Sequence, residues 1–182
     1  TWSDGKPVTA HDFEFAWKRA ASVELAADYG YMFEVVDGYA DVWAENPSAD
    51  AALNVTATDE KTLVVTLANA VAYWNELLAF PTYYPVREDV VASEAWATAP
   101  ETYVCNGPYT ISKWEHNSVI TLKKNENYVD ADAVKLDVLK CYLSDDANNM
   151  LTNFKNGDWL LIDDVPTNEM AALKVDYPTE YK

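Results

Sequence analysis

Carboxylates are the side chains of this sequence with the most obvious capacity for chemistry. Among its 182 residues the chain has 30 Asp and Glu against 13 Lys and Arg, which gives a formal net charge of −17. Three closely spaced acidic pairs stand out: Asp130-Ala131-Asp132, Asp145-Asp146 and Asp163-Asp164. Paired carboxylates can act as acid and base in glycoside hydrolysis, and clustered ones can bind Ca²⁺. Both possibilities compete with a simple solvated acidic surface.

The evidence for an enzyme is weak. With 30 acidic residues a pair of carboxylates can always be chosen, so their abundance does not indicate a glycosidase. The sequence has no Gly-x-Ser-x-Gly, His-Glu-x-x-His or P-loop pattern, the usual signs of nucleophilic, zinc and nucleotide chemistry. His11 and His116 have no plausible Ser or Cys partner nearby in the sequence. We therefore predict that the chain is not an enzyme and has no catalytic residues, with a carbohydrate-active enzyme as the less favoured alternative.

A metal site is also disfavoured. None of the acidic pairs lies in a loop with the alternating ligands, central Gly and closing Glu that a calcium loop needs. Two cysteines cannot make a structural zinc site alone, and the two histidines lie in unrelated contexts. We therefore expect no metal and no cofactor. Spacing leaves two possibilities equally open for Cys105 and Cys141, a disulfide in an exported protein or two buried free thiols.

The composition is that of a folded protein with an acidic surface. Hydrophobic residues make up 49% of the chain and charged residues 24%, so a chain of this length can bury a core. An acidic surface repels phosphate backbones, and no cluster of Lys and Arg occurs, which excludes nucleic acid as a partner. The longest uncharged stretch, Thr62 to Asn75, is too short and too polar for a membrane span. The 24 aromatic residues can supply either a large core or a stacking surface for a ligand.

The first half of the chain is predicted to pack helices against a hairpin. Thr9 and Asp12 form a capping box at the start of a helix. Its apolar face has the spacing i, i+3, i+4, i+7: Phe13, Ala16, Trp17 and Ala20. Polarity alternates over 53–58 and 62–67 on either side of a turn at 59–61, which predicts an antiparallel hairpin with one buried face. Shorter helices are expected at 26–33, 38–45 and 71–78.

The rest of the chain is predicted to contain a second hairpin, two further strands and three helices. A weak helix with loops spans 85–100, and strands follow at 109–114, 119–124 and 136–143. A helix begins at Asp145-Asp146 and ends at Asn156-Gly157. The apolar run Trp159 to Ile162 is expected to form a short strand, and Thr167 to Glu169 begins a last helix. Because the strands come as hairpins, the fold class is α+β, with a boundary in the least hydrophobic stretch, 98–105.

Five short strings then occur in an order that carries a family resemblance. The first is WSDGKPVTAHDF at 2–13, followed by Trp17 and Arg19, and it is similar to the pattern WSDG-x-PVTA-x-DF. The others are DEKTLVVTL at 59–67, NGPY at 106–109, KNENY at 124–128 and FKNGD at 154–158. Together they resemble the oligopeptide-binding solute receptors of ATP-binding-cassette (ABC) importers, solute-binding protein family 5. The sequence departs at Val129, where these receptors usually have Trp, and at 157–160, where they have Gly-Glu-Ile-Asp.

The resemblance implies a fold and a place within a larger protein. The fold would be α+β, with mixed hairpin-built sheets and packed helices, as part of a two-lobed periplasmic-binding-protein type II fold. Residues 1–104 would be the small accessory domain of the first lobe, and residues 105–182 part of the core of that lobe. The second lobe would then lie outside this chain, which we expect to be an internal fragment of a longer protein.

The resemblance also implies a function and its partners. Such a receptor captures oligopeptides outside the cytoplasm, in the periplasm or lipid-anchored at the outer face of the membrane, and delivers them to the permease subunits of an ABC importer. We expect a monomer. Other members of the family bind sugars or nickel complexes, so a non-peptide solute is the alternative ligand. Trp2, Asp4, Gly5 and Asp12 are expected to serve a turn and a helix start rather than to bind anything.

Four residues are the candidates for ligand contact that the resemblance implies. Tyr29 falls where the family places a tyrosine near the bound peptide, and Phe80 where some members have a side-chain pocket residue. Asp163 and Asp164 follow the predicted short strand, in a segment that reaches the cleft in relatives. Each has a plainer alternative: Tyr29 as a core residue, Phe80 as a wall residue, and the acidic pair as the cap of the helix predicted from Thr167.

Overall fold

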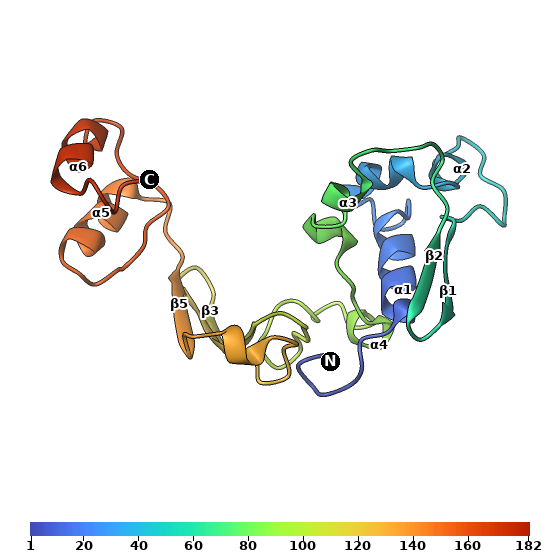
Figure 1. The fold of residues 1–182 in the computed structure, drawn as a ribbon, viewed down its shortest axis with the longest axis horizontal. Helices are drawn as coiled ribbons and strands as arrows, with labels where there is room; N and C mark the ends of the chain where they lie inside the picture. The colour runs from blue at the N-terminus through green and yellow to red at the C-terminus, as the bar shows by residue number, and fades with distance from the viewer. The chain divides into compact units, whose positions relative to one another are not determined.

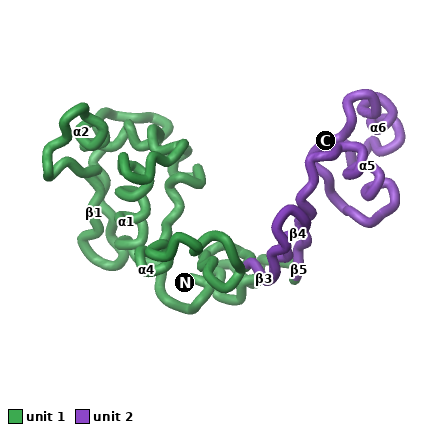
Figure 2. The backbone as a smooth tube through the Cα atoms, turned by 180° about the vertical axis from the view of Figure 1, so that it is seen from behind, with its two compact units in different colours: residues 1–110, 124–137 green, residues 111–123, 138–182 purple.

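The computed structural model describes all 182 residues, and they divide into two compact units. The first unit comprises residues 1–110 and 124–137, and the second comprises residues 111–123 and 138–182 (Figure 2). The assignment of 1–104 to an accessory domain and 105–182 to a lobe concerns the whole protein and stays a prediction. No helix in the chain has both the length and the apolar character needed to cross a membrane.

In the first unit a helix packs on a two-stranded hairpin, as the sequence predicts (Figure 1). Helix α1 (Ala10–Ala20) has the expected capping box between Thr9 and Asp12. Strands β1 (Val55–Asp59) and β2 (Thr62–Val65) pair antiparallel, with Val55 opposite Val65. The Ala57 N–H donates to the Glu14 carboxylate at 2.8 Å. This bond ties the helix to the hairpin, and hydrogen bonds from Lys18 and Ala57 lower the pKa of Glu14.

The other predicted helices of the first unit are shorter than expected. They are the 3₁₀-helix η1 (Gly30–Val35) and the single α-helical turns α2 (Tyr39–Val42), α3 (Trp74–Leu77) and α4 (Glu88–Val91). Two further short 3₁₀-helices, η2 (Pro81–Tyr83) and η3 (Ala131–Ala133), were not predicted. None of these segments is long enough to be stable by itself, because helix nucleation costs more than a single turn returns. Their conformation therefore depends on packing against other parts of the unit.

Aromatic rings form the centre of the first unit's core. Trp17 is buried, and its ring lies against Phe33 (5.8 Å between ring centroids), Trp74 (6.1 Å) and Tyr83 (5.2 Å). The Trp17 indole N–H donates to the Tyr83 carbonyl at 2.8 Å, and the Tyr83 hydroxyl donates to the Met32 carbonyl at 2.6 Å. Burial raises the pKa of Tyr83 to about 12, so its hydroxyl remains a donor across the physiological range.

A buried arginine fixes the N-terminal turn. Arg87 is 8% exposed, and its guanidinium contacts both carboxylate oxygens of Asp89 at 2.8 and 2.6 Å and the Asp4 carboxylate at 2.6 Å. Lys6 pairs with Asp89 at 2.9 Å. Gly5 has a φ of +86°, in the left-handed region that the turn requires. Asp4 and Gly5 therefore serve the turn, as predicted.

The second unit contains a three-stranded sheet and two helices. Its sheet has the order β3 (Tyr109–Glu115), β4 (Val119–Lys124), β5 (Val138–Tyr142), and β4 pairs antiparallel with β5, Ile120 opposite Cys141. Helix α5 (Ala147–Lys155) has Asp146 as its N-cap and ends before Gly157. Helix α6 (Met170–Asp176) packs on it through the Phe154 and Tyr177 rings, 5.4 Å apart. The predicted α+β class and the boundaries of α5 are confirmed.

One strand predicted from the sequence is absent. Residues Trp159 to Ile162 form no strand, and their one backbone hydrogen bond runs from the Trp159 N–H to the Asn153 carbonyl of α5. The apolar composition of this run favours a buried strand, but a strand forms only when another strand completes its hydrogen bonds. The prediction was therefore wrong for this chain because no neighbouring segment lies alongside these residues.

The first test concerns the hydroxyl of Tyr83. Tyr83→Phe removes the donor to the Met32 carbonyl and leaves that acceptor unpaired, so we expect the free energy of unfolding to fall by about 1–2 kcal/mol. Urea unfolding followed by tryptophan fluorescence measures it. Tyr84→Phe is the matched control, because the exposed Tyr84 hydroxyl bonds to the Ala79 carbonyl at 3.2 Å and should contribute under about 0.5 kcal/mol. Equal losses in the two variants would contradict the role given to Tyr83.

The second test concerns acid sensitivity. Hydrogen bonds and charge from Arg87 and Lys6 hold the pKa of Asp89 well below its usual range, and Arg87 also lowers the pKa of Asp4. A carboxyl group whose pKa is lower in the folded state than in the unfolded state stabilises the fold above about pH 4. This stabilisation is lost as the pH falls through the pKa of the folded state. Asp89→Asn should therefore unfold with a shallower dependence on pH between 5 and 2.

Screening by solvent limits how much the ion pairs of Asp89 stabilise the fold. The Asp89 carboxylate is largely exposed, so Asp89→Asn should cost no more than about 1 kcal/mol at pH 7. Asp50→Asn, at an exposed aspartate with no ion pair, is the control and should follow the parent curve. A pH dependence of Asp89→Asn that is as steep as that of the parent would show that the Arg87 cluster contributes nothing.

Candidate functional site

Two of the four predicted ligand residues lie side by side in the first unit. The Tyr29 and Phe80 rings have centroids 5.2 Å apart and planes inclined by 55°, although 51 residues separate them in sequence. Tyr31 adds a third ring, 6.1 Å from that of Tyr29. We call Tyr29, Tyr31 and Phe80 the aromatic patch. Tyr31 was not predicted as a site residue, although its position two residues after Tyr29 is a signal that could have identified it.

The core interaction of Tyr83 places these rings together. Tyr29 is the residue before η1, and Phe80 is the residue before η2. The Tyr83 hydroxyl of η2 holds the Met32 carbonyl of η1, and the Phe33 and Tyr83 rings pack with centroids 4.6 Å apart. Because the two 3₁₀-helices are fixed to each other, the residues at their N-terminal ends are adjacent.

Gly30 allows η1 to approach the end of α1. A Cβ atom on Gly30 would lie 2.9 Å from the Ala20 carbonyl oxygen, closer than real Cβ contacts. The neighbouring atom is backbone, so it cannot move aside as a flexible side chain would. Any other residue at this position would push η1, and Tyr29 with it, away from α1.

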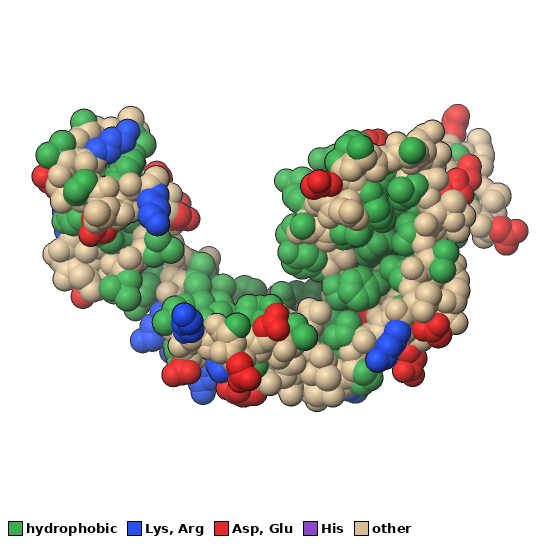
Figure 3. Space-filling view, viewed as in Figure 1, with side chains coloured by type: hydrophobic (Ala, Val, Ile, Leu, Met, Phe, Trp, Pro, Cys, Tyr) green, Lys and Arg blue, Asp and Glu red, His purple; other side chains and the backbone are tan.

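The aromatic patch is accessible to a ligand. Tyr29 is 51% exposed and Tyr31 is also exposed, which is inconsistent with the plainer alternative that Tyr29 is a core residue. Phe80 is half-buried and packs against the core, so it also fits the wall alternative. Hydrophobic side chains gather over α3 and the segments next to it in this unit (Figure 3). Such rings can stack on apolar or aromatic groups, and the tyrosine hydroxyls can form hydrogen bonds.

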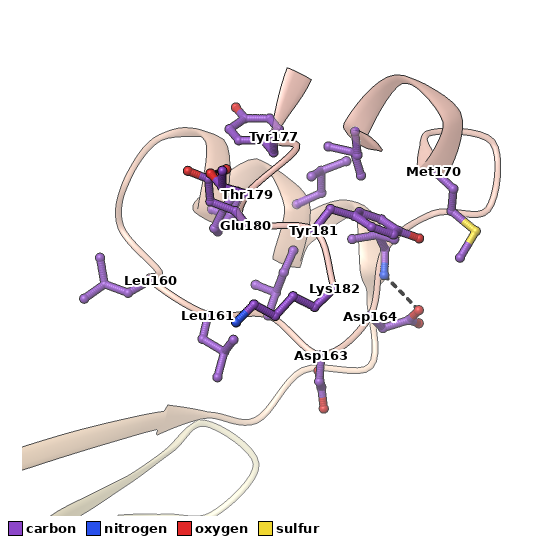
Figure 4. Close-up of a pocket in the computed structure, with 15 residues that line it drawn as sticks. Leu160, Leu161, Asp163, Asp164, Met170, Tyr177, Thr179, Glu180, Tyr181 and Lys182 are labelled. Atoms are coloured by element: carbon purple, nitrogen blue, oxygen red, sulfur yellow. Dashed lines mark hydrogen bonds between the residues drawn. The ribbon is translucent and has the colours of Figure 1, made fainter. Parts of the chain in front are cut away.

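Asp163 and Asp164 lie in the second unit, at a hollow of about 540 Å³ (Figure 4). Buried apolar side chains from α5 and α6 line it, with Leu151 and Leu173 among them. The Asp164 carboxylate accepts a hydrogen bond from the Val165 N–H at 2.8 Å, and both acids are exposed. They do not cap the last helix, which begins at Met170 with Glu169 as its N-cap. The structure thus pairs Tyr29 with Phe80 and places the acidic pair in another unit.

A second hollow, of about 600 Å³ and polar, lies in the first unit and was not predicted. Its lining includes Asp37, Asp41, Asp50 and Asn54. The Asn54 amide donates to the Asp37 carboxylate at 3.0 Å, and the other acids are not drawn into a cluster. No group of three or more His, Cys, Asp and Glu side chains in the chain is arranged to hold a metal ion.

The two cysteines are free thiols. Cys105 is half-buried, and its Sγ donates to the Tyr109 carbonyl at 3.3 Å, while Cys141 is exposed on β5. Burial raises the pKa of the Cys105 thiol, although hydrogen bonds from Gly107 and Ser3 act in the other direction. A thiol with a raised pKa is a poor nucleophile. Of the two possibilities left open by the sequence, the structure contains the free thiols, but neither of them is fully buried as that possibility assumed.

The strings that carried the sequence resemblance contact one another. The Asn127 amide donates to the Ser3 carbonyl at 3.1 Å, and the Asn125 amide donates to the Gly107 carbonyl at 2.8 Å. The Trp2 indole donates to Asp12 at 3.3 Å. Three strings far apart in sequence therefore meet in the first unit through backbone-directed bonds. Their role is to hold the fold, as predicted for Trp2 and Asp12.

Comparison with known proteins gives a consistent family match. Residues 1–181 match the sequence model described as bacterial extracellular solute-binding proteins, family 5 Middle. The chain is 38% identical over 181 residues to the oligopeptide-binding protein OppA of Bacillus subtilis, covering 96% of the chain and 33% of that protein. It is 34% identical over 158 residues to the dipeptide-binding protein DppE of Bacillus subtilis, covering 86% of the chain and 29% of that protein. It is 32% identical over 196 residues to the probable deoxycholate-binding periplasmic protein YgiS of Escherichia coli, covering 100% of the chain and 34% of that protein.

Solved structures show the same likeness in three dimensions. Listeria monocytogenes OppA bound to peptide is 34% identical, with a TM-score of 0.79 over 87% of this chain and 31% of that one. Haemophilus influenzae OppA in complex with RPPGFSPFR is 28% identical, with a TM-score of 0.88 over 99% of this chain and 36% of that one. The chain thus spans about a third of the length of the relatives that it matches.

The aromatic patch gives a prediction about stability that separates its members. Tyr29→Ala should change the free energy of unfolding by less than about 1 kcal/mol, because half of the side chain is already in water. Phe80→Ala should cost about 2–3 kcal/mol, because Phe80 packs against the core and its removal leaves a cavity. Urea unfolding of the two variants measures the difference. A loss for Tyr29→Ala as large as that for Phe80→Ala would show that Tyr29 is a core residue after all.

Proposed function

The chain belongs to the family 5 bacterial extracellular solute-binding proteins, and on that premise we propose that it is part of a receptor that captures oligopeptides for an ABC importer. Its fold is part of the periplasmic-binding-protein fold of these receptors. The relatives named for binding oligopeptides and dipeptides support a peptide ligand. Because the chain spans only about a third of their length, the activity belongs to the whole protein.

The observation that carries the proposal is the pairing of Tyr29 with Phe80. Two rings from distant parts of the chain form an accessible apolar surface, and the core fixes their positions. A peptide receptor with broad specificity needs surfaces that accept side chains of different shapes, and aromatic rings meet that need by stacking with little dependence on sequence. We propose that the aromatic patch contacts a side chain of the bound peptide.

The proposed mechanism is non-covalent capture. The peptide's backbone would be held by hydrogen bonds of the strand type, its side chains would occupy pockets, and two lobes would close around it. Closure is favoured only if both lobes contact the ligand in the closed state, so the lobe outside these 182 residues is required. Asp163 and Asp164 are further proposed contacts. Their exposed carboxylates could pair with a cationic group of the peptide.

The cellular setting follows from the same premise. We propose an extracytoplasmic receptor, periplasmic or lipid-anchored at the outer face of the membrane, that acts as a monomer and contacts the permease subunits of its importer. The receptor would perform no catalysis and need no cofactor. The chain's charge of −17 is compatible with this setting because it favours solubility and disfavours association between copies.

A non-peptide solute is the second candidate. The 32% identity to YgiS, a probable deoxycholate-binding protein, extends over the whole chain, so the family match alone does not fix the ligand class. Tyr29, Tyr31 and Phe80 would also suit an apolar or cyclic solute, since ring faces stack on such groups. The two candidates differ in the masses that the protein would retain on purification.

Native mass spectrometry of the full-length protein, purified without denaturation, tests the proposal. A spread of added masses that match short peptides is the expected result, and one discrete added mass would support the second candidate instead. Tyr29→Ala should then weaken binding of a retained peptide by about three- to tenfold, the worth of one aromatic contact. Isothermal titration with that peptide, synthesised, measures the change.

Tyr29→Phe is the matched control for that measurement. It keeps the ring and removes only the hydroxyl, so stacking should be preserved and the affinity should stay close to that of the parent. Unchanged affinity in Tyr29→Ala would remove the aromatic patch from the site. Loss of affinity in both variants would mean that the hydroxyl, rather than the ring face, contacts the ligand.

A further inference from the structure

Three asparagines of this chain precede a small residue that leaves their side chains open to attack from the main chain. Asn106 and Asn156 precede Gly, and Asn117 precedes Ser. The amide nitrogen of the second residue can attack the asparagine side chain in such pairs, because glycine has no Cβ atom and serine only a short side chain to hinder the approach. The reaction is deamidation, and its rate in a folded protein depends on how the local backbone is held.

Deamidation needs only water as a co-reactant. The nitrogen of the second residue forms a bond to Cγ of the asparagine, the bond from Cγ to Nδ2 breaks, and ammonia leaves with the proton of the attacking N–H. Water then opens the cyclic succinimide at either of its carbonyl groups. One product is aspartate. The other is isoaspartate, in which the main chain passes through Cβ and Cγ and is therefore longer.

The attacking nitrogen is held by a backbone hydrogen bond in two of the three pairs. The Gly157 N–H donates to the Phe154 carbonyl at 2.9 Å, at the end of α5. The Ser118 N–H donates to the Glu115 carbonyl at 3.0 Å, in the turn between β3 and β4. Each bond must break before the nitrogen can lose its proton and turn toward the asparagine side chain, so the structure protects both pairs.

Asn106 lacks this protection. No oxygen atom accepts from the Gly107 N–H, which is directed to the Cys105 thiol, and sulfur is a weak acceptor. The Asn106 side chain has no hydrogen-bond partner that would hold it away from Gly107. Accessibility alone would select Asn156, which is exposed while Asn106 is half-buried. Hydrogen bonding selects Asn106 instead.

This pair lies between two anchored points of the first unit. On one side the Ser3 N–H donates to the Cys105 carbonyl at 2.7 Å. On the other side the buried Asn125 donates from its side-chain amide to the Gly107 carbonyl at 2.8 Å and from its N–H to the Pro108 carbonyl at 2.9 Å. A longer main chain between these points would move the Gly107 carbonyl away from Asn125. The buried amide would then be unpaired, which is costly.

We infer that Asn106 is the main deamidation site of these 182 residues, and that its conversion to isoaspartate breaks the contact between Gly107 and Asn125. The modification is spontaneous and takes up water in exchange for ammonia. It needs no ligand, so the inference goes beyond the proposed function and does not depend on it. The receptor loses stability as the modified fraction grows.

Ageing of the full-length protein tests this inference. The protein is kept at mildly alkaline pH and physiological temperature, and samples are digested and analysed by mass spectrometry with fragmentation that distinguishes isoaspartate from aspartate. A urea-denatured sample gives the intrinsic rate of each pair, and the ratio of the denatured to the folded rate is its protection. We expect Asn106 to be protected about tenfold less than Asn117 and Asn156, the difference made by one hydrogen bond that need not break.

Gly107 allows a matched variant that leaves the fold intact. Its φ lies outside the left-handed region, and a Cβ atom on it would have no neighbour within 4 Å. Gly107→Ala should therefore melt with the parent, while its methyl group hinders the attack and slows deamidation at Asn106 severalfold. Asn106→Asp adds the carboxylate without lengthening the main chain, so it should also melt close to the parent. Aged parent protein that contains isoaspartate should melt a few degrees lower than both.

The other outcomes overturn the inference. Equal protection at the three asparagines, or less protection at Asn156 than at Asn106, would show that the hydrogen bonds do not select the site. An unchanged rate in Gly107→Ala would contradict attack by the Gly107 nitrogen. Aged protein that melts with the parent would contradict the loss of the contact with Asn125. Peptide binding enters none of these measurements, so their failure leaves the proposed function untouched, and the reverse also holds.

Discussion

The hydrogen bond from the Tyr83 hydroxyl to the Met32 carbonyl, together with the ring packing of Tyr83 on Trp17 and Phe33, is the constraint on which the first unit depends. Two 3₁₀-helices that are too short to be stable alone are held against α1 by this one side chain. The arrangement of the aromatic patch follows from it, since Tyr29 and Phe80 are the residues that precede those two helices. The proposed ligand surface is thus positioned by a residue of the core.

Charge and chemistry are separated in this chain. The acids are mostly solvated, and Asp4 and Asp89 have lowered pKa values because they pair with the buried Arg87. They stabilise the N-terminal turn and take no part in a site. The aromatic patch proposed to contact a ligand contains no ion pair, so its contribution to binding would depend on ring faces and would be little affected by salt.

The sequence predicted those elements whose causes are local. The capping box of Thr9 and Asp12, the hairpin around Glu60-Lys61 and the Asp146 cap of α5 each depend on residues within a few positions, and the structure contains all three. The strand at 159–162 was predicted wrongly, because its formation depends on a partner that local sequence cannot supply. Tyr31 was not predicted as a member of the aromatic patch although it lies two residues after Tyr29, because its exposure is a property of the folded chain.

By itself, then, the sequence determined the family, the α+β class and the positions of the capped helices and hairpins, since motif strings, periodicity and caps are properties of neighbouring residues. Only the tertiary structure decided that Tyr29 meets Phe80, that Arg87 is buried between Asp4 and Asp89, and that Asp163 and Asp164 do not cap α6. These contacts join residues that are distant in sequence or depend on where a helix begins in the packed chain. Their geometry is set by close packing in the core, which no local pattern encodes.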